Sequence, residues 1–334
     1  MTSQALAVSL GEPSGIGPEI VVKAWRALRA TGPAFVVIGD LAALANAAGD
    51  TSLVRAVQDI AHGAAIFGEA LPVIDIPLAH PVTPGAAAAD AAGLVVQWIE
   101  IAARLVMSAR ASALVTAPIA KAPLYAAGFR FPGHTEFLGE LAPPPNDAPG
   151  KGPVMMLTAA DLRVSLVTIH EPLARVPELI SREAIINAGL VTATALRRDF
   201  GILRPRLAVA GLNPHAGEAG TIGREEISIV EPAVRALTEQ GVDVSGPHPS
   251  DTLFHPEARK RYDAVLCLYH DQALIPVKML DFWGGVNITL GLSIVRTSPD
   301  HGVAFDIAGK GIARPDSMIA ALRLAAEIAA RRSA

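Results

Sequence analysis

The sequence has little cysteine, few aromatic residues and no large excess of charge of either sign. A single cysteine, Cys267, excludes an internal disulfide, and its position in the apolar run AVLCLYH predicts a small buried core residue. Aromatic residues make up only 4% of the chain, which argues against stacking platforms for single-stranded nucleic acid. The net charge is -4, so nothing favours nucleic acid or an anionic membrane as a partner.

The chain also lacks a long uncharged apolar run. Its most apolar helical pattern, GLVVQWIEIAARLVMSA, contains Glu100 and Arg104 and is too polar to span a bilayer. The first residues, MTSQALAVSLGEPSG, have neither the basic segment nor the apolar segment of a signal peptide. We therefore expect a soluble, cytoplasmic protein.

The residues that are abundant predict an α/β fold. The chain is 51% hydrophobic, and short apolar runs rich in β-branched residues alternate with longer helical patterns, which is typical of a mostly parallel sheet. The runs 153–159 and 162–169 lie too close together for a helix between them, so they predict an antiparallel hairpin in that sheet. The segment LAPPPNDAPGKGP, residues 141–153, predicts a surface loop and a possible boundary between lobes.

Three histidines come at or just after the ends of apolar strands. His170 ends LRVSLVTIH, His215 follows RLAVAGLNP, and His270 ends AVLCLYH. Ligands bind at the carboxyl ends of parallel strands, and imidazoles suit a divalent metal ion, so the three could share one. Asp251 and Asp271 could orient an imidazole or move a proton. The alternative is that the histidines are hydrogen-bonded loop residues and the aspartates cap turns.

Other polar residues indicate an anionic ligand. In FPGHTEFLGEL, His134 and Thr135 open a short helix whose amide groups could bind an anion, although Thr135 could instead cap that helix. Lys278, Asn287 and Arg296 are scattered among apolar residues. Because an unpaired buried charge is costly, the two cations either have internal carboxylate partners or bind an anionic substrate.

Three glycine-rich segments predict turns or loops. GLNPHAGEAG frames His215, and a loop that bears the entropic cost of so many glycines usually wraps a ligand or makes an awkward turn. GEPSGIGPE is not a dinucleotide fingerprint; its glycines precede Pro18 and suit the first turn of a helix. DHGVAFDIAGKGIARPDS, residues 300–317, forms a long loop before the final helix.

Six motifs, in order, resemble those of the 4-hydroxythreonine-4-phosphate dehydrogenase family: GEPSGIGPE, PGHTE, GLNPHAGE, YHDQALIPVK, GVNITLGL and RTSPDHG. The resemblance covers nearly the whole chain, and its two ends are also similar to the wider isocitrate and isopropylmalate dehydrogenase fold. It implies a two-lobed α/β enzyme with a mostly parallel sheet and helices on both faces. The expected lobes are 1–140 with 280–334, and 141–279, with the active-site cleft between them. It also implies a homodimer with active sites at the subunit interface.

The resemblance gives these residues roles. It implies that one divalent ion (Zn, Mg or Co) is bound by three histidines contributed across the dimer: His170, His215 and His270. It implies substrate contacts from His134, Thr135, Lys278, Asn287 and Arg296. Lys278 and Asp251 are the candidates for the catalytic base. By analogy with the wider fold, the loop with His301, Gly302, Asp306, Gly309 and Gly311 would hold NAD or NADP.

The implied reaction oxidises 4-phosphooxy-L-threonine at C3, and the β-keto acid then decarboxylates to 3-amino-2-oxopropyl phosphate. The segments HDQALIPVK and DIAGKGIARPDS favour this biosynthetic reaction. The first alternative is the related catabolic branch that oxidises phosphothreonate or phosphoerythronate. Alternatives of other classes are a metal-dependent hydrolase, a phosphate acyltransferase, and a metal or nucleotide sensor without turnover.

Overall fold

The computed structural model describes residues 4–333, and the chain divides into two compact units. Unit 1 combines Met1–Pro143 with Leu292–Ala334, and unit 2 is Pro144–Gly291. The first break falls inside the proline- and glycine-rich segment 141–153. The second follows a strand that belongs to unit 2 because it pairs along its length with another strand of that unit.

Unit 1 is built on a parallel sheet. All the strand pairs in this unit are parallel, and the two strands β1 and β2 are buried along their whole length. Continuous apolar runs suit this position because helices cover both faces of such a sheet. The spatial order is β3 (Val54–Ala56), β4 (Leu71–Asp75), β2 (Phe35–Gly39), β1 (Leu6–Ser9), β5 (Leu114–Thr116) and β12 (Arg296–Pro299).

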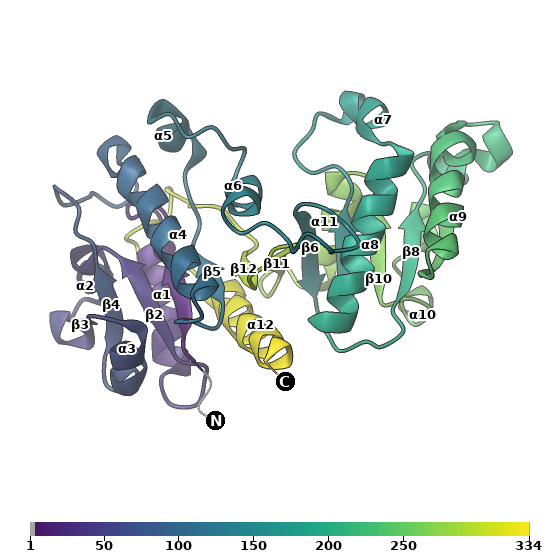
Figure 1. The fold of residues 1–334 in the computed structure, drawn as a ribbon. Helices are drawn as coiled ribbons and strands as arrows, with labels where there is room; N and C mark the ends of the chain where they lie inside the picture. The colour runs from purple at the N-terminus through teal and green to yellow at the C-terminus, as the bar shows by residue number, and fades with distance from the viewer. Residues whose placement is uncertain (1–3, 334) are drawn as a thin grey trace. The chain divides into compact units, whose positions relative to one another are not determined.

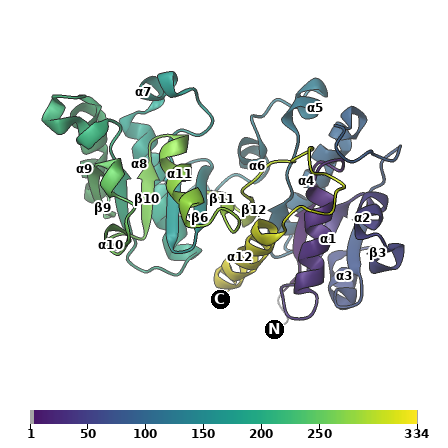
Figure 2. The ribbon, with the colours of Figure 1, turned by 180° about the vertical axis from the view of Figure 1, so that it is seen from behind.

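Helices cover both faces of the sheet of unit 1. The helices of this unit are α1 (Gly17–Leu28), α2 (Leu41–Ala48), α3 (Ile60–Ile66), α4 (Ala92–Met107), α5 (Lys121–Ala126), α6 (His134–Leu141) and α12 (Asp316–Arg332). One face carries α3 and α4, and the other carries α1 and α12 (Figures 1 and 2). As expected, GIGPE forms the start of a helix, with Pro18 in the first turn of α1.

Unit 2 has a mixed sheet. Its order is β11 (Val286–Leu290), β6 (Val154–Ala159), β7 (Leu162–Leu166), β10 (Ala264–Cys267), β8 (Arg206–Ala210) and β9 (Asp243–His248). Only β6 is antiparallel to its neighbours, so the predicted hairpin is confirmed. The helices are α7 (Val176–Leu179), α8 (Arg182–Arg198), α9 (Glu231–Glu239), α10 (Pro256–Arg259) and α11 (His270–Leu280). α8 covers one face and α11 the other (Figures 1 and 2), so the predicted α/β class is confirmed.

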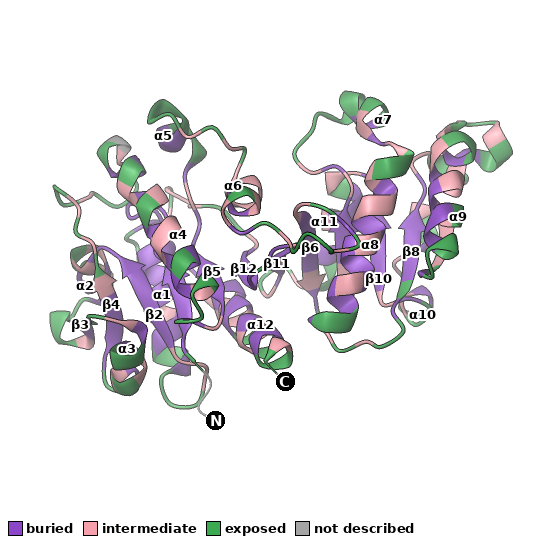
Figure 3. Cartoon of the chain, in the orientation of Figure 1, coloured by how far each residue is buried: buried purple, intermediate pink, exposed green. Residues whose placement is uncertain are grey.

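Burial follows the predicted pattern. The central strands are buried, whereas the edge strands β3 and β9 are largely not, and the helices have both buried and exposed sides (Figure 3). Cys267 is fully buried in β10, as its apolar run predicted, and burial raises the pKa of its thiol. Within residues 4–333, no single helix is long and apolar enough to cross a membrane; the bent pair Leu173–Leu179 and Arg182–Arg198 passes that test only when taken together.

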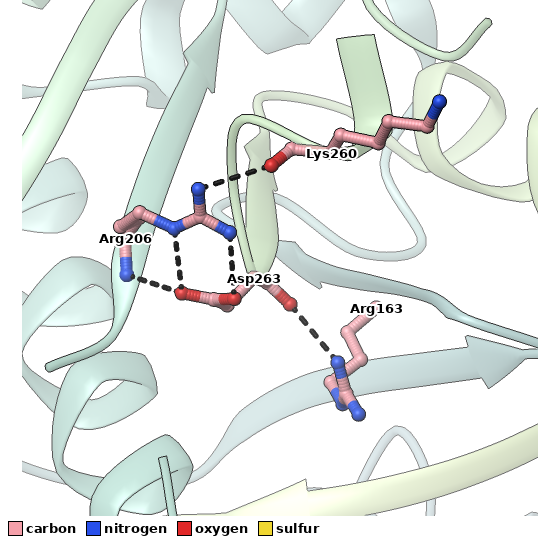
Figure 4. A network of polar contacts seen from close by, with 4 residues as sticks. All are labelled: Arg163, Arg206, Lys260 and Asp263. Carbon is pink, nitrogen blue, oxygen red and sulfur yellow. Dashed lines mark hydrogen bonds and ion pairs between the residues drawn. The ribbon is translucent and has the colours of Figure 1, made fainter. Parts of the chain in front are cut away.

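An ion pair fixes the amino ends of two strands in unit 2. Asp263, just before β10, accepts hydrogen bonds from the backbone N (2.8 Å), Nε (3.2 Å) and a terminal nitrogen (3.1 Å) of Arg206, the first residue of β8. Burial opposes ionisation of Asp263, but these bonds outweigh it and lower its pKa. Arg206 and Arg163 also donate to the carbonyls of Lys260 and Asp263 (Figure 4). At the opposite ends of β8 and β10, the chain continues into the segments that contain His215 and His270.

Three elements differ from expectation. The sequence pattern of residues 223–240 predicts one continuous α-helix, but the helix begins as a π-helical segment, Glu226–Val230, which α9 continues. The apolar run 264–270 stops being a strand at Cys267, so His270 is the first residue of α11. No pattern predicted β9, because Gly246 and Pro247 interrupt its apolar signal.

Candidate active site

The carboxyl edge of the sheet in unit 2 brings two of the three histidines together. β10 lies between β7 and β8 and is parallel to both, so the residues after these strands emerge at one edge. His170 follows β7, and His270 follows β10. Their imidazole rings lie 5.5 Å apart, centroid to centroid, and are inclined at 44°. Topology has therefore joined residues that are a hundred positions apart in sequence.

A carboxylate fixes the orientation of one of these rings. Nδ1 of His270 lies 2.8 Å from Oδ1 of Asp271. A carboxylate on one ring nitrogen sets the tautomer and directs the other nitrogen outward, which is how metal-binding histidines are usually held. The side chain of His270 is 32% exposed, so Nε2 can reach a ligand.

His215 lies in an unusual backbone segment at the same edge. It follows β8, is exposed, and begins a run of left-handed residues, 215–219, with φ between 43° and 79°. We call residues 215–219 the left-handed segment. Among residues 4–333, no group of three or more His, Cys, Asp or Glu side chains lies close enough to hold a metal ion. The structure therefore pairs His170 with His270 and does not bring His215 into a triad with them.

Gln272, which no sequence pattern singles out as a site residue, connects the strand ends of this edge. It is buried in the first turn of α11. Its Oε1 accepts from the backbone N of Leu268 (2.6 Å), after β10, and its Nε2 donates to the carbonyl of Gly211 (2.7 Å), after β8. Nε2 also donates to Oγ of Ser250 (2.8 Å). The only signal in the sequence was its place in the YHDQ motif.

The other predicted residues of unit 2 lie on three different elements. Asp251 is exposed in the turn Ser250–Thr252, beside the Ser250 that Gln272 contacts. Lys278 is half-buried on α11, with Nζ 5.3 Å from the centre of the Phe282 ring. Asn287 lies on β11, and its Oδ1 is buried without a hydrogen-bond partner in the described structure. A buried amide oxygen in that state is a ready acceptor for a ligand.

Unit 1 contains the predicted start of a helix at His134. α6 begins at His134, and its N-cap is Gly133, with no side-chain cap hydrogen bond. The alternative in which Thr135 caps the helix is therefore wrong, because Thr135 is the second helical residue. An uncapped helix start presents backbone N–H groups to an anion.

A buried cation accompanies this helix start in unit 1. Arg296 on β12 is 3% exposed and donates a hydrogen bond to Oγ1 of Thr116 on β5 (2.7 Å). Burial lowers the pKa of Arg296 to about 9, against the opposing effect of Glu136, so the guanidinium is still charged at neutral pH. Such a group, together with a helix start, suits a phosphate or carboxylate.

His134 itself is a neutral imidazole. Burial lowers its pKa well below 6.5, and the positive charges of Arg296 and Lys121 lower it further. Its Nε2 is buried without a hydrogen-bond partner in the described structure. A neutral ring can donate to a substrate oxygen without adding charge, so this atom is a candidate for substrate contact.

The depressed pKa of His134 gives a testable dependence of stability on pH. Below pH 6.5 the unfolded chain binds a proton that the folded chain does not, so the free energy of unfolding falls as the pH drops through this range. The slope reaches at most about 1.4 kcal/mol per pH unit for this one group. Urea unfolding at several pH values should show a shallower slope for His134→Gln than for a matched change at exposed His62. Equal slopes in the two variants would contradict the assignment.

The long loop before α12 is fixed to α1 by two side chains. Lys23 Nζ donates to the carbonyl of Ala313 (2.7 Å), and Oε1 of Glu19 accepts from the N–H of the same residue (2.8 Å). A cavity of about 570 Å³ in unit 1 lies against α1 and α2, and Gly309 and Gly311 of this loop line it. The predicted nucleotide residues His301, Gly302 and Asp306 are exposed and lie outside that lining.

Comparison with known proteins gives a consistent picture. Residues 32–325 match the family described as pyridoxal phosphate biosynthetic protein PdxA. The 4-hydroxythreonine-4-phosphate dehydrogenase of Caulobacter vibrioides is 65% identical over 332 residues, covering 99% of each chain. That of Maricaulis maris is 54% identical over 335 residues, covering 98% of each. The crystal structure of the Klebsiella pneumoniae enzyme of that name superposes with a TM-score of 0.82 at 39% identity, covering 98% of this chain and 100% of the other.

Proposed function

Because the chain belongs to the PdxA family of pyridoxal phosphate biosynthetic proteins, we propose that it catalyses the reaction for which its relatives are named. In that reaction, 4-phosphooxy-L-threonine is oxidised by NAD or NADP to 2-amino-3-oxo-4-phosphooxybutanoate. This β-keto acid then loses its carboxylate to give 3-amino-2-oxopropyl phosphate. The observation that carries the proposal is the 65% identity over 99% of both chains. We place the enzyme in the cytoplasm, where the nicotinamide cofactors are.

The residues of unit 1 are proposed to bind the anionic groups of the substrate. His134 and Thr135, at the uncapped start of α6, would donate to phosphate oxygens together with the helix amides. Arg296 would supply the charge, since it is held in place by Thr116 and already desolvated. In unit 2, Lys278 and Asn287 are further proposed contacts, because one carries a positive charge and the other a buried acceptor oxygen.

The histidines of unit 2 fit a divalent metal ion by donor type, and His270 also by the contact that orients its ring. His170 and His270 lie side by side, and Asp271 directs the ring of His270. We propose that they and His215 bind one Zn, Co or Mg ion, with ligands contributed across a homodimer, so that a single chain need not present all three together. When bound, the ion would lower the pKa of the substrate hydroxyl and act as a Lewis acid.

The remaining steps need a base and a hydride acceptor. Lys278, or Asp251 through a water molecule, would take the proton of the C3 hydroxyl as hydride passes from C3 to the nicotinamide ring. The loop with His301, Gly302 and Asp306 is proposed to hold the adenosine part of that cofactor. Its attachment to α1 through Glu19 and Lys23 would keep the loop ordered.

An exposed apolar surface on α11 is the proposed dimer contact. Ile275, Met279, Phe282 and Trp283 are 63%, 81%, 60% and 50% exposed. Their spacing of four, three and one residues places them along one side of α11 and the turn that follows. Because the same helix begins with His270 and carries Lys278, a second copy docked here would lie beside the proposed metal ligands.

Replacing Met279 with glutamate should shift the protein from dimer to monomer. A charge in an apolar interface must be desolvated on association, so we expect the dimer dissociation constant to rise at least about a hundredfold. Analytical ultracentrifugation over a concentration series measures this. Leu203→Glu is the matched control, because Leu203 is 86% exposed in the same unit and lies outside this surface. Equal behaviour of the two variants would place the dimer contact elsewhere.

The reaction is tested by following NADH and NADPH absorbance with 4-phosphooxy-L-threonine. The assay uses chelated protein, then protein resupplied with Zn, Co or Mg, with phosphothreonate as a parallel substrate. Metal-restored turnover that favours phosphooxythreonine is the expected result. A preference for phosphothreonate would move the enzyme to the catabolic branch. Absence of reduction with either substrate, despite bound metal, would refute the dehydrogenase and favour a hydrolase or a sensor.

A further inference from the structure

We propose that Glu226 is a positioning residue for His215, acting through Asn213 to hold the left-handed segment in place. The inference rests on the proposed function, in which His215 binds a divalent metal ion. Nothing in the reaction itself calls for Glu226, and the sequence motif GLNPHAGE ends well before it. The backbone of residues 215–219 and the contacts that hold its first turn point to this role.

The left-handed segment is a backbone arrangement that L-amino acids avoid. His215, Ala216, Glu218 and Ala219 have φ values of 52°, 51°, 43° and 52°, and only Gly217 among the five lacks a Cβ. Left-handed residues normally occur singly, because Cβ crowds the following carbonyl oxygen. Such a conformation persists only where surrounding contacts over-determine it. The segment therefore requires an anchor outside itself.

Glu226 supplies that anchor just before the segment. Its Oε1 accepts from the backbone N of Asn213 (2.7 Å), and its Oε2 accepts from Nδ2 of the same residue (2.9 Å). Glu225 also accepts from Nδ2 (2.7 Å). Glu226 is 1% exposed, whereas Glu225 is partly exposed. Two hydrogen bonds to one buried carboxylate fix both the backbone and the side chain of Asn213, two residues before His215.

The surrounding glycines show that this contact is packed tightly. A Cβ on Gly217 would lie 2.7 Å from Oε2 of Glu226, and a Cβ on Gly223 would overlap the side-chain amide of Asn213. Both positions therefore have to be glycine while Glu226 holds Asn213. Glu226 is also the first residue of the π-helical segment Glu226–Val230, and such segments are frequent at functional sites.

The change Glu226→Gln removes the anchor with little change of shape. A glutamine amide has one acceptor oxygen and one NH₂ group, so it cannot accept from both the backbone N and Nδ2 of Asn213. One donor would face another, and Asn213 would lose its fixed position. His215 would then sample orientations that do not suit a metal ion, while His170 and His270 would be unaffected.

The test measures metal affinity in the full-length protein by Co²⁺ titration, read from the visible absorption of the bound ion. We expect Glu226→Gln to weaken Co²⁺ binding about 10- to 100-fold, the usual effect of losing a group that orients a ligand. The matched control is Glu231→Gln, on the same stretch of helix, where the carboxylate is 42% exposed and pairs with Arg235 at 3.6 Å. Circular dichroism and thermal unfolding confirm folding of each variant.

A second variant disturbs the contact between Glu226 and Asn213 by crowding Asn213. Gly223→Ala should displace Asn213 from Glu226 and weaken Co²⁺ binding to a similar degree, so a folding failure of Glu226→Gln leaves the idea testable. Unchanged Co²⁺ affinity in either folded variant, with His215→Ala defective, would refute the role of Glu226 and leave the proposed function intact. Failure of the wild-type protein to bind Co²⁺ would refute the proposed metal site and this inference together.

Discussion

Replacing Arg296 with methionine is expected to lower kcat/KM for the phosphorylated substrate about 100- to 1000-fold while leaving the free protein as stable as before, or more stable. Arg296 is 3% exposed, and burial lowers its pKa to about 9 despite the opposing effect of Glu136. A group that is already desolvated offers an anion strong charge-assisted hydrogen bonds, so its loss is costly to binding. In the free protein the same desolvation is a penalty, which an apolar side chain of similar volume removes.

Steady-state kinetics and thermal unfolding of the same preparations decide this. The control is Arg104→Met, since Arg104 forms an exposed ion pair with Glu100 on α4 and should change neither quantity much. This combination of lower kcat/KM with unchanged or higher stability is informative, because replacing a residue with a purely structural role would lower both quantities. A fall in kcat/KM of less than tenfold for Arg296→Met would contradict its proposed role as a substrate contact.

The positions of several candidate site residues in the fold could be predicted, because their signals are local and parallel strand pairing brings them together. His170 and His270 each follow a continuous apolar run, and parallel pairing of those runs makes their ends neighbours. Arg296 stood out because a charge within an apolar run needs a partner or a ligand. The start of α6 at His134 was visible from the glycine before it. In each case a short stretch of sequence carried enough information.

Other features depend on contacts between distant residues and were not predictable. Glu226 looks like any acid at the start of a helix, and only the fold shows that it is buried against Asn213. Gln272 likewise matters because two strand ends happen to lie within its reach. The left-handed segment was suspected from its glycines, but four of its five residues have a Cβ, so composition could not give its conformation.

The second large effect is expected at the histidine edge of unit 2. His270→Ala should reduce metal-dependent turnover by about 10³-fold or more, because it removes a proposed ligand, whereas Asp271→Asn should cost about 10- to 100-fold, because it only disturbs the orientation of the ring. Metal content measured after dialysis should follow the same order. The two variants together separate binding of the ion from orientation of its ligand.

The chain contains its own control for this pair. His255 and Glu257 form a similar contact, Nδ1 to Oε2 at 3.1 Å, but here the histidine is more exposed and the pair lies outside the edge where His170 and His270 meet. His255→Ala and Glu257→Gln should therefore leave metal content and turnover unchanged. If His255→Ala lowered turnover as much as His270→Ala, the ion would not be bound where β7 and β10 end. If only His270→Ala did so, the hydrogen bond that Asp271 accepts from His270 would matter because of its position. The similar contact of His255 would have no effect on turnover, whereas this one would orient an imidazole toward the bound ion.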